Sequence, residues 1–144
     1  MVERPPDSAK EVYNGGMVQP SLFDTTALKP TLAHQLEVLP PRPESTVLQT
    51  LPAYHLHLKS GDYSVYTADD FAGDMKKLGL FIPAKKVAQL ALVDLQHWIA
   101  FLASPTGDHL QAKTVSRKIA ALRNYFQWLH SLKVIPLDPS ARIH

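Results

Sequence analysis

The most constraining feature of this sequence is a long stretch near its C-terminus, residues 114–132, that has helical periodicity. One set of apolar side chains recurs at spacings of 4, 3, 4 and 3 residues, which predicts one buried helix face made of Val115, Ile119, Leu122, Phe126 and Leu129. A second apolar line makes the latter half apolar nearly all round, and its members are Ala121, Tyr125, Trp128 and Leu132. We therefore expect either burial of this half on several sides or a bend into two helices near Arg123-Asn124.

Two helices are predicted upstream, on either side of a turn at Ser60-Gly61. The first spans 47–60, where apolar residues follow at three- and four-residue spacing and Pro52 is tolerable if it lies in the first turn. The second runs from about Ser64 to Leu78, with Ser64 or Thr67 as the cap and Gly79 as the residue that ends it. Phe71, Met75 and Leu78 form its apolar stripe.

A further helix is predicted over 92–103, with an inward face of Leu92, Leu95, Trp98, Ile99 and Leu102. Ser104-Pro105-Thr106-Gly107 ends it, and Pro136 and Pro139 mark the end of the C-terminal stretch. No strand-like alternation of useful length is present, and nothing repeats at a fixed period. The predicted fold class is all-α, a compact bundle of four to five helices.

The prolines divide the chain into two regions, because eight of the twelve lie between Pro5 and Pro52. Residues 1–44 are interpreted as a flexible, Pro-rich arm or linker, largely irregular, and residues 45–144 as the helical domain. A short helix over 31–39 would be either a partner-binding element or an incidental turn.

Composition excludes several classes of function. The chain has no cysteine, so it offers neither disulfides nor thiolate metal sites, and a cytoplasmic location is expected. No apolar run approaches the roughly 20 residues that span a bilayer, so no membrane association is expected. The His55-x-His57 pair has no third ligand at metal-binding spacing. We expect no metal, no other cofactor and no small-molecule substrate.

Basic residues are concentrated at the C-terminal end. Residues 1–60 carry five basic and six acidic side chains, whereas 61–144 carry ten and seven. From Lys113 onward six basic residues face only Asp138. Such an excess suits a polyanion, although a solvated helix face would look the same.

Several motifs resemble the core-binding domain (the N-terminal, SAM-like domain) of the tyrosine recombinase or phage integrase family. The C-terminal one reads Thr114-Val-Ser-Arg117-Lys118-Ile-Ala-Ala-Leu122-Arg123-Asn-Tyr-Phe126-Gln-Trp-Leu129, followed by Val134-Ile-Pro-Leu-Asp138-Pro139-Ser140. Upstream motifs are Ser64-x-x-Thr67-x-x-x-Phe71-x-x-Asp74-Met75-x-x-Leu78 and Leu92-Val-Asp94-Leu95-x-x-Trp98-Ile99-x-x-Leu102. A departure is Ala91, where the family usually has a Ser or Thr cap. The resemblance covers about 47–144.

The resemblance implies a domain that holds duplex DNA as half of a C-shaped clamp, for recombination or integration of DNA. The family's other half is a catalytic domain with an arginine-histidine set and a nucleophilic tyrosine, and it is absent from this sequence. Tyr125 or Tyr66 with Arg123 or His130 shows no catalytic spacing. We therefore expect no catalytic residue and no enzyme activity from this chain alone. The implied partners are double-stranded DNA and other recombinase protomers.

The family's DNA contacts fall on two helix starts, which correspond here to Ser64, Tyr66 and Thr67, and to Lys113, Thr114, Arg117 and Lys118. A helical wheel independently places Lys113 and Arg117 opposite the buried stripe. Thr114 is expected to open the last helix, either as a plain cap or also as a DNA contact, and Arg117 would otherwise be a solvated charge.

Arg123 is the last residue assigned to the DNA contacts, and it has two interpretations. It would contact DNA, or it would have a structural role, lying over Trp128 or bonding to a neighbouring helix. The pairs Lys76-Lys77 and Lys85-Lys86 would touch phosphates or simply be solvated surface.

A second hypothesis comes from another functional class. The chain would be a helical protein-interaction module of a truncated recombinase relative, without direct DNA binding. This alternative requires an exposed patch made of Tyr125, Trp128 and Leu132.

Overall fold

The structure is a computed structural model that describes residues 38–143. In chain order its elements are α2 (Val47–Ser60), α3 (Val65–Phe81), the 3-10 helix η1 (Val87–Gln89), α4 (Leu92–Ala103) and α5 (Ala112–Ser131). The prediction of an all-α bundle is confirmed over this range. The helix considered for 31–39 and most of the predicted arm fall outside the described residues. Among the described helices, none combines the length and the apolar composition that crossing a bilayer requires.

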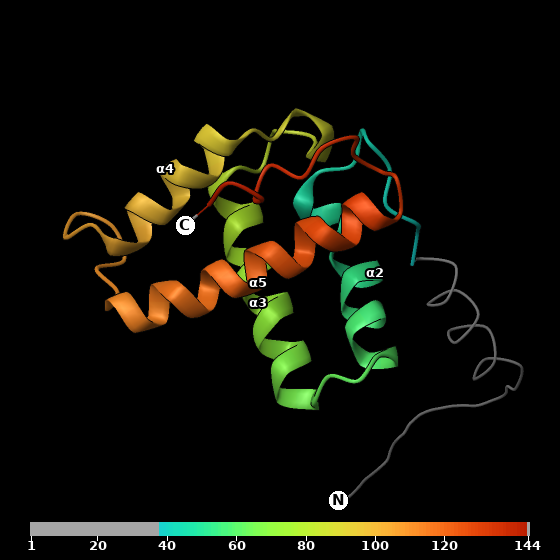
Figure 1. Ribbon diagram of the computed structural model, residues 1–144, viewed down its shortest axis with the longest axis horizontal. Coiled ribbons are helices and arrows are strands. Elements are labelled where there is room, and N and C mark those ends of the chain that lie inside the picture. The colour runs from blue at the N-terminus through green and yellow to red at the C-terminus, as the bar shows by residue number, and fades with distance from the viewer. Residues whose placement is uncertain (1–37, 144) are drawn as a thin grey trace, which may run out of the picture. The chain divides into compact units, whose positions relative to one another are not determined.

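The helices are arranged around α5 (Figure 1). α2 and α3 lie antiparallel, since His55 bonds to Asp69 near one end and Leu48 contacts Gly79 near the other. α5 crosses this pair, and α4 packs against α5 from the other direction. One continuous core results, and its largest fully buried side chains include Trp98, Tyr54, Tyr125, Phe126 and Met75.

α2 begins at a capping box and contains a proline. The Thr46 hydroxyl accepts a hydrogen bond from the Gln49 N–H at 3.3 Å, and the Gln49 side chain accepts one from the Thr46 N–H at 2.9 Å. Pro52 lies inside the helix, beyond the first turn, which corrects the expectation for it. Because proline has no N–H, the Leu48 carbonyl loses its helical donor. Burial of one face offsets this loss, through Val47, Thr50, Tyr54 and Leu58.

α3 begins at Ser64 and continues past Gly79. The Ser64 hydroxyl accepts a hydrogen bond from the Thr67 N–H at 3.1 Å, which confirms the predicted cap. The prediction that Gly79 ends the helix is wrong, because α3 runs to Phe81. A Cβ at Gly79 would lie 2.7 Å from Leu48 Cδ2 and 2.8 Å from Leu48 Cγ. The glycine therefore serves the close approach of α2 and α3.

α4 has the predicted bounds, and its N-cap residue, Ala91, offers no capping side chain. The Asp94 carboxylate accepts hydrogen bonds from the Ala91 N–H at 2.9 Å and from Lys85 Nζ at 2.8 Å. Burial raises the pKa of Asp94, but these hydrogen bonds outweigh it and hold the pKa below its ordinary value. The inward face is as predicted, with Leu95, Trp98 and Leu102 buried.

α5 is one uninterrupted helix, so there is no break near Arg123-Asn124. Its second half is buried on several sides, through Ala121, Leu122, Tyr125, Phe126, Trp128 and Leu129. The Tyr125 hydroxyl lies 2.6 Å from Thr50 Oγ1, and burial raises the Tyr125 pKa. The patch required by the protein-interaction alternative does not form, because Tyr125 and Trp128 are buried and only Leu132 is exposed, at 50%.

A Schellman turn ends α5. Lys133 adopts a φ of 62°, its N–H donates to the His130 carbonyl at 3.0 Å, and the Val134 N–H donates to the Leu129 carbonyl at 3.0 Å. The helix therefore ends at Ser131, within one residue of the predicted end at Leu132 and before Pro136. The following segment returns to the core, where Val134, Ile135 and Ile143 are buried.

The folded helical unit starts at Leu39, before the predicted boundary at 45. The Val87 N–H donates to the Ser45 carbonyl at 2.7 Å, and the Ala88 N–H donates to the Pro43 carbonyl at 3.1 Å. These bonds attach the segment before α2 to η1. The last residues of the predicted arm therefore belong to the folded unit.

An ion pair joins α3 to α5. Lys118 Nζ lies 2.6 Å from Asp74 Oδ1, and the two side chains are only 10% and 16% exposed. A nearly buried lysine without its carboxylate would keep most of its desolvation cost. The pair therefore fixes where α5 crosses α3.

The Gly79 contact predicts different effects for alanine at the two glycines of α3. Gly73→Ala is expected to raise the free energy of unfolding by about 0.5–1 kcal/mol, because a Cβ there meets nothing within 4 Å and alanine favours the helix. Gly79→Ala gains the same propensity but must displace Leu48, at a cost of about 1–3 kcal/mol. Urea denaturation of both variants measures the difference, and equal stability of the two would contradict the packing role.

Removal of the carboxylate partner of Lys118 is expected to destabilise the fold. Asp74→Ala should lower the free energy of unfolding by about 3 kcal/mol, because a mostly buried ammonium is left unpaired. The double variant Asp74→Leu/Lys118→Met should recover most of that loss, because it removes both charges. A double variant as unstable as Asp74→Ala in thermal melts would show that the unpaired charge is not the cause.

Candidate nucleic-acid interface

The first turn of α5 has no capping side chain, and we call it open in this sense. The helix begins at Ala112 with Gln111 as its N-cap residue, and Gln111 makes no side-chain capping bond. Thr114 was predicted to open the helix, and this is corrected: it lies in the first turn, half-buried, and does not cap. In the described hydrogen bonds, the backbone N–H groups of 112–114 have no acceptor, and the first intrahelical bond is from the Val115 N–H to the Gln111 carbonyl.

This open start distinguishes α5 from the other three α-helices. α2 has the Thr46 hydroxyl as a cap, α3 has the Ser64 hydroxyl, and α4 has the Asp94 carboxylate in its first turn. α5 has neither a capping side chain nor an acidic residue in its first turn. The positive end of its dipole and the free N–H groups of 112–114 are therefore available to an external anion.

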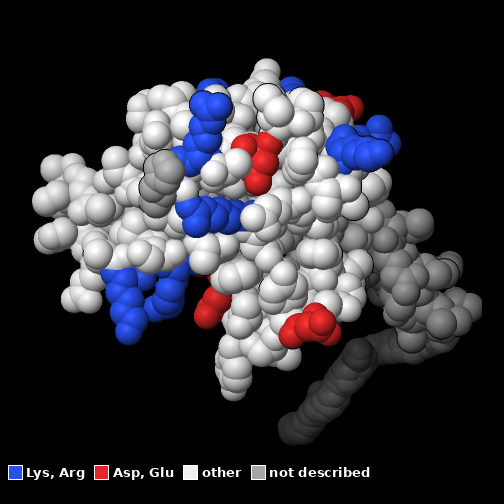
Figure 2. Space-filling view, viewed as in Figure 1, with Lys and Arg blue, Asp and Glu red and all other residues white. Residues whose placement is uncertain are grey.

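Two exposed basic residues lie at the same helix start. Lys113 and Arg117 are both exposed, on the side of α5 away from the buried Val115. Figure 2 shows basic side chains projecting from the region where α5 begins, at the lower left of the view. The predicted orientation of both residues is confirmed. Their contact with DNA remains a prediction.

Lys118 and Arg123, also predicted at this interface, are engaged inside the protein. Lys118 is buried and paired with Asp74. The Arg123 guanidinium donates to the Ile143 carbonyl and is partly buried, so it holds the C-terminal segment against α5. This contact supports a structural role for Arg123, although its partner is the C-terminal segment and not a neighbouring helix.

The start of α3 presents hydroxyl groups. The Ser64 hydroxyl is used within the turn, since it accepts from the Thr67 N–H at 3.1 Å and donates to the Thr67 hydroxyl at 3.0 Å. The Thr67 hydroxyl thus keeps its own proton for an outside acceptor. Tyr66 is 84% exposed and projects from the same turn. These groups can donate hydrogen bonds without adding positive charge.

Acidic residues surround this second helix start, a feature that the sequence analysis missed. Asp62, Asp69 and Asp70 are all exposed, and within the described residues only Asp69 has a partner, His55, at 2.8 Å. A phosphate approaching α3 therefore meets repulsion that it does not meet at α5. The charge count by position in the sequence would have revealed this difference. The charges at the α5 start therefore favour an anion more than those at the α3 start do.

The two helix starts are separated by a distance that the fold fixes. α3 and α5 meet at Asp74 and Lys118, and both helices run back from that crossing to their N-termini. Lys113 lies about 8 Å along α5 from the crossing, and Ser64 lies about 15 Å along α3, at 1.5 Å of rise per residue. Tyr63, beside the start of α3, bonds to Asn124, and Asn124 lies about 16 Å along α5 from Lys113, so the two starts are on the order of 20 Å apart.

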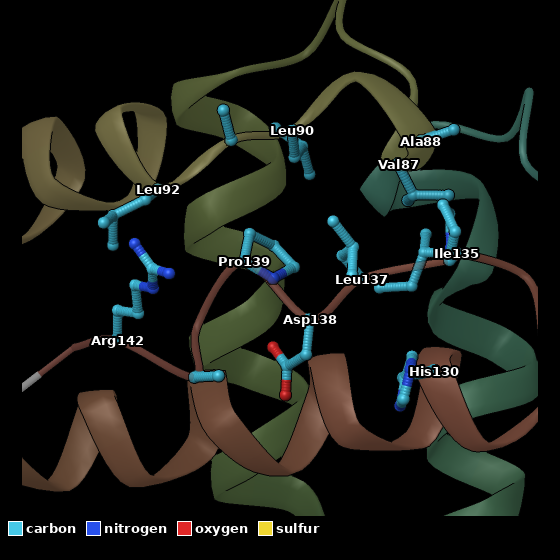
Figure 3. A pocket seen from close by; sticks show the side chains of 13 residues that line it. Val87, Ala88, Leu90, Leu92, His130, Ile135, Leu137, Asp138, Pro139 and Arg142 are labelled. Atoms are coloured by element: carbon cyan, nitrogen blue, oxygen red, sulfur yellow. The ribbon is translucent and has the colours of Figure 1, made fainter.

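An apolar groove lies elsewhere. It has a volume of about 780 Å³ and is formed between the η1–α4 segment and the C-terminal segment (Figure 3). Its walls are mainly apolar. Its polar members are His130, Asp138 and Arg142, of which Asp138 already accepts hydrogen bonds from the Ser140 N–H and hydroxyl. None of the residues predicted to contact DNA lines it.

The residues considered for catalysis are not assembled into a site. Tyr125 is fully buried, whereas Tyr66 projects from the first turn of α3 and His130 lies in the last turn of α5. Within residues 38–143 there is no group of three metal-ligating side chains, and His55 is instead paired with Asp69. Of the lysine pairs, Lys85 is held by Asp94.

Comparisons with known proteins bear on the same helices. The tyrosine recombinase XerC of Pseudomonas syringae pv. syringae (strain B728a) is 25% identical to the chain over 93 residues, which are 64% of this chain and 31% of that relative. The chain thus spans under a third of the relative's length. No solved structure matches. The family model for the phage integrase N-terminal SAM-like domain matches residues 51–133, from within α2 to the turn that ends α5. Since this match covers more than half of the chain, the protein belongs to the phage integrase N-terminal SAM-like domain family.

Proposed function

We propose that this chain binds duplex DNA, with the start of α5 as its main anchor. This proposal rests mainly on the uncapped first turn of α5. Unpaired N–H groups and the positive end of the helix dipole coincide there with two exposed cations, Lys113 and Arg117. Backbone phosphate is the anion that such an arrangement suits. Arg117, one turn into the helix, also has the length to reach a guanine edge in the major groove.

The start of α3 would supply a second, neutral contact. Tyr66 and Thr67 have hydroxyl protons available, and Ser64 orders the turn that presents them. A spacing on the order of 20 Å between the two starts exceeds the major groove width of about 12 Å, so the starts would contact phosphates on its two sides. The acidic residues near α3 would limit that contact to hydrogen bonding.

We infer that this DNA grip is the core-binding half of a larger recombinase clamp. The family match and the similarity to a tyrosine recombinase support this role. Recombination would then require a catalytic domain and other recombinase protomers, and the chain alone would position DNA without cutting it. A cytoplasmic location, expected from the composition, suits this role.

The anchor predicts a salt-dependent affinity that two substitutions weaken. Fluorescence anisotropy with a labelled duplex should show affinity falling steeply with salt. Lys113→Ala should weaken binding roughly tenfold at about 0.1 M salt and lower the salt slope by about 1, because one phosphate contact is lost. Arg117→Glu should weaken it further, since it adds repulsion.

Lys133→Ala is the matched control for these substitutions. Lys133 is also an exposed lysine, but it lies in the turn that ends α5, about 30 Å from Lys113 along the helix. It should leave the affinity and the salt slope unchanged. Absence of binding to every duplex tried at about 50 mM salt, or equal effects of Lys113→Ala and Lys133→Ala, would overturn the assignment of this face.

The chain alone is expected to leave supercoiled plasmid intact. No tyrosine in the described residues lies beside an arginine-histidine set, and burial of Tyr54 and Tyr125 raises the pKa of both hydroxyls. Incubation with plasmid, followed by denaturing electrophoresis, should give neither nicked circles nor a protein–DNA adduct. A phosphotyrosine adduct would show that the chain carries a catalytic site.

A further inference from the structure

Asn124 links α2 and α5 to the turn that precedes α3 through two hydrogen bonds. The Tyr54 hydroxyl donates to Asn124 Oδ1 at 2.7 Å, and Asn124 Nδ2 donates to the Tyr63 hydroxyl oxygen at 2.7 Å. Tyr54 lies in α2, Asn124 lies in α5, and Tyr63 stands directly before the Ser64 cap of α3. The chain of bonds runs from the core outward.

The direction of this chain is fixed by its members. Tyr54 is fully buried, and its proton is used on the only acceptor atom of the Asn124 amide. The amide can then offer only N–H to Tyr63, so the Tyr63 oxygen accepts. A phenol that accepts in this way still has its own proton to donate.

The Tyr63 hydroxyl is placed to use that proton outside the protein. Tyr63 is 39% exposed, and among residues 38–143 its hydroxyl donates to no other group. Its ring packs against Phe71 at a centroid distance of 6.3 Å, so the side chain is held on both sides. An ordered donor therefore lies at a partly exposed position, directly before the turn that carries Tyr66 and Thr67.

From this geometry we propose that Tyr63 donates a hydrogen bond to a phosphate oxygen of bound DNA, and that Asn124 is the positioning residue that turns its proton outward. This inference rests on the proposed DNA binding and adds a contact to it. The neighbouring residue, Asp62, is acidic, so the site carries no net positive charge. The contact is therefore a directed hydrogen bond and not an ion pair.

A neutral donor and a cation have different signatures in the same titration. Tyr63→Phe should weaken binding about five- to tenfold on every duplex sequence, as expected for a lost hydrogen bond to a charged group, and leave the salt slope unchanged. Tyr125→Phe is the matched control, because its hydroxyl bonds to Thr50 inside the core. It should leave affinity unchanged whatever it does to the melting temperature.

The positioning role is tested by Asn124→Asp in a double-mutant cycle. A carboxylate at 124 accepts from both tyrosines, so the fold is kept while the Tyr63 proton turns inward. In that background Tyr63→Phe should cause no further loss of affinity, whereas it causes the full five- to tenfold loss in the wild type. Any effect of the added charge is common to both arms of the cycle.

The outcomes separate this inference from the proposed function. If the wild type binds and Lys113→Ala lowers the salt slope, but Tyr63→Phe has no effect, the Tyr63 contact is wrong and the DNA grip stands. If Tyr63→Phe weakens binding equally with and without Asn124→Asp, the contact exists and the positioning role of Asn124 is wrong. If the wild type does not bind, both proposals fail.

Discussion

The structure depends on the burial of one half of one helix. From Ala121 to Leu129, α5 is enclosed by α2, α3 and the returning C-terminal segment, and its aromatic side chains fill the centre of the core. The other half of the same helix reaches beyond this enclosure, and its first turn is left open. The helix thus connects its buried half to the exposed first turn that we propose as the anion site, so the free N–H groups of that turn are held in place by packing far from them.

Two polar contacts fix the positions of the packed helices relative to one another. The Lys118–Asp74 pair fixes where α5 crosses α3, and the Tyr54–Asn124–Tyr63 chain ties the entrance of α3 to the same helix. Both contacts join elements far apart in the sequence. Their combined effect is to hold two helix starts at a constant separation, which is the property that a surface needs in order to match the regular spacing of DNA phosphates.

Periodicity predicted the helices well because each buries one apolar face. The bounds of α4 and the exposure of Lys113 and Arg117 follow from that repeat alone. Gly79 was misassigned because a glycine needed for close helix approach looks the same in sequence as one that ends a helix. The burial of Lys118 could not be predicted because its partner, Asp74, is 44 positions away in the sequence. The role proposed for Tyr63 could not be predicted from the sequence, because it depends on the direction of hydrogen bonds between side chains that are far apart in the chain.

The central claim is that DNA binds at the starts of α5 and α3. Two-dimensional amide NMR of the labelled chain, titrated with a short duplex, tests it residue by residue. The largest and earliest shifts should come from the open first turn at 112–114, with smaller shifts at 63–67. Shifts confined to the apolar groove around Leu137 and Arg142, with the first turn of α5 unchanged, would contradict it.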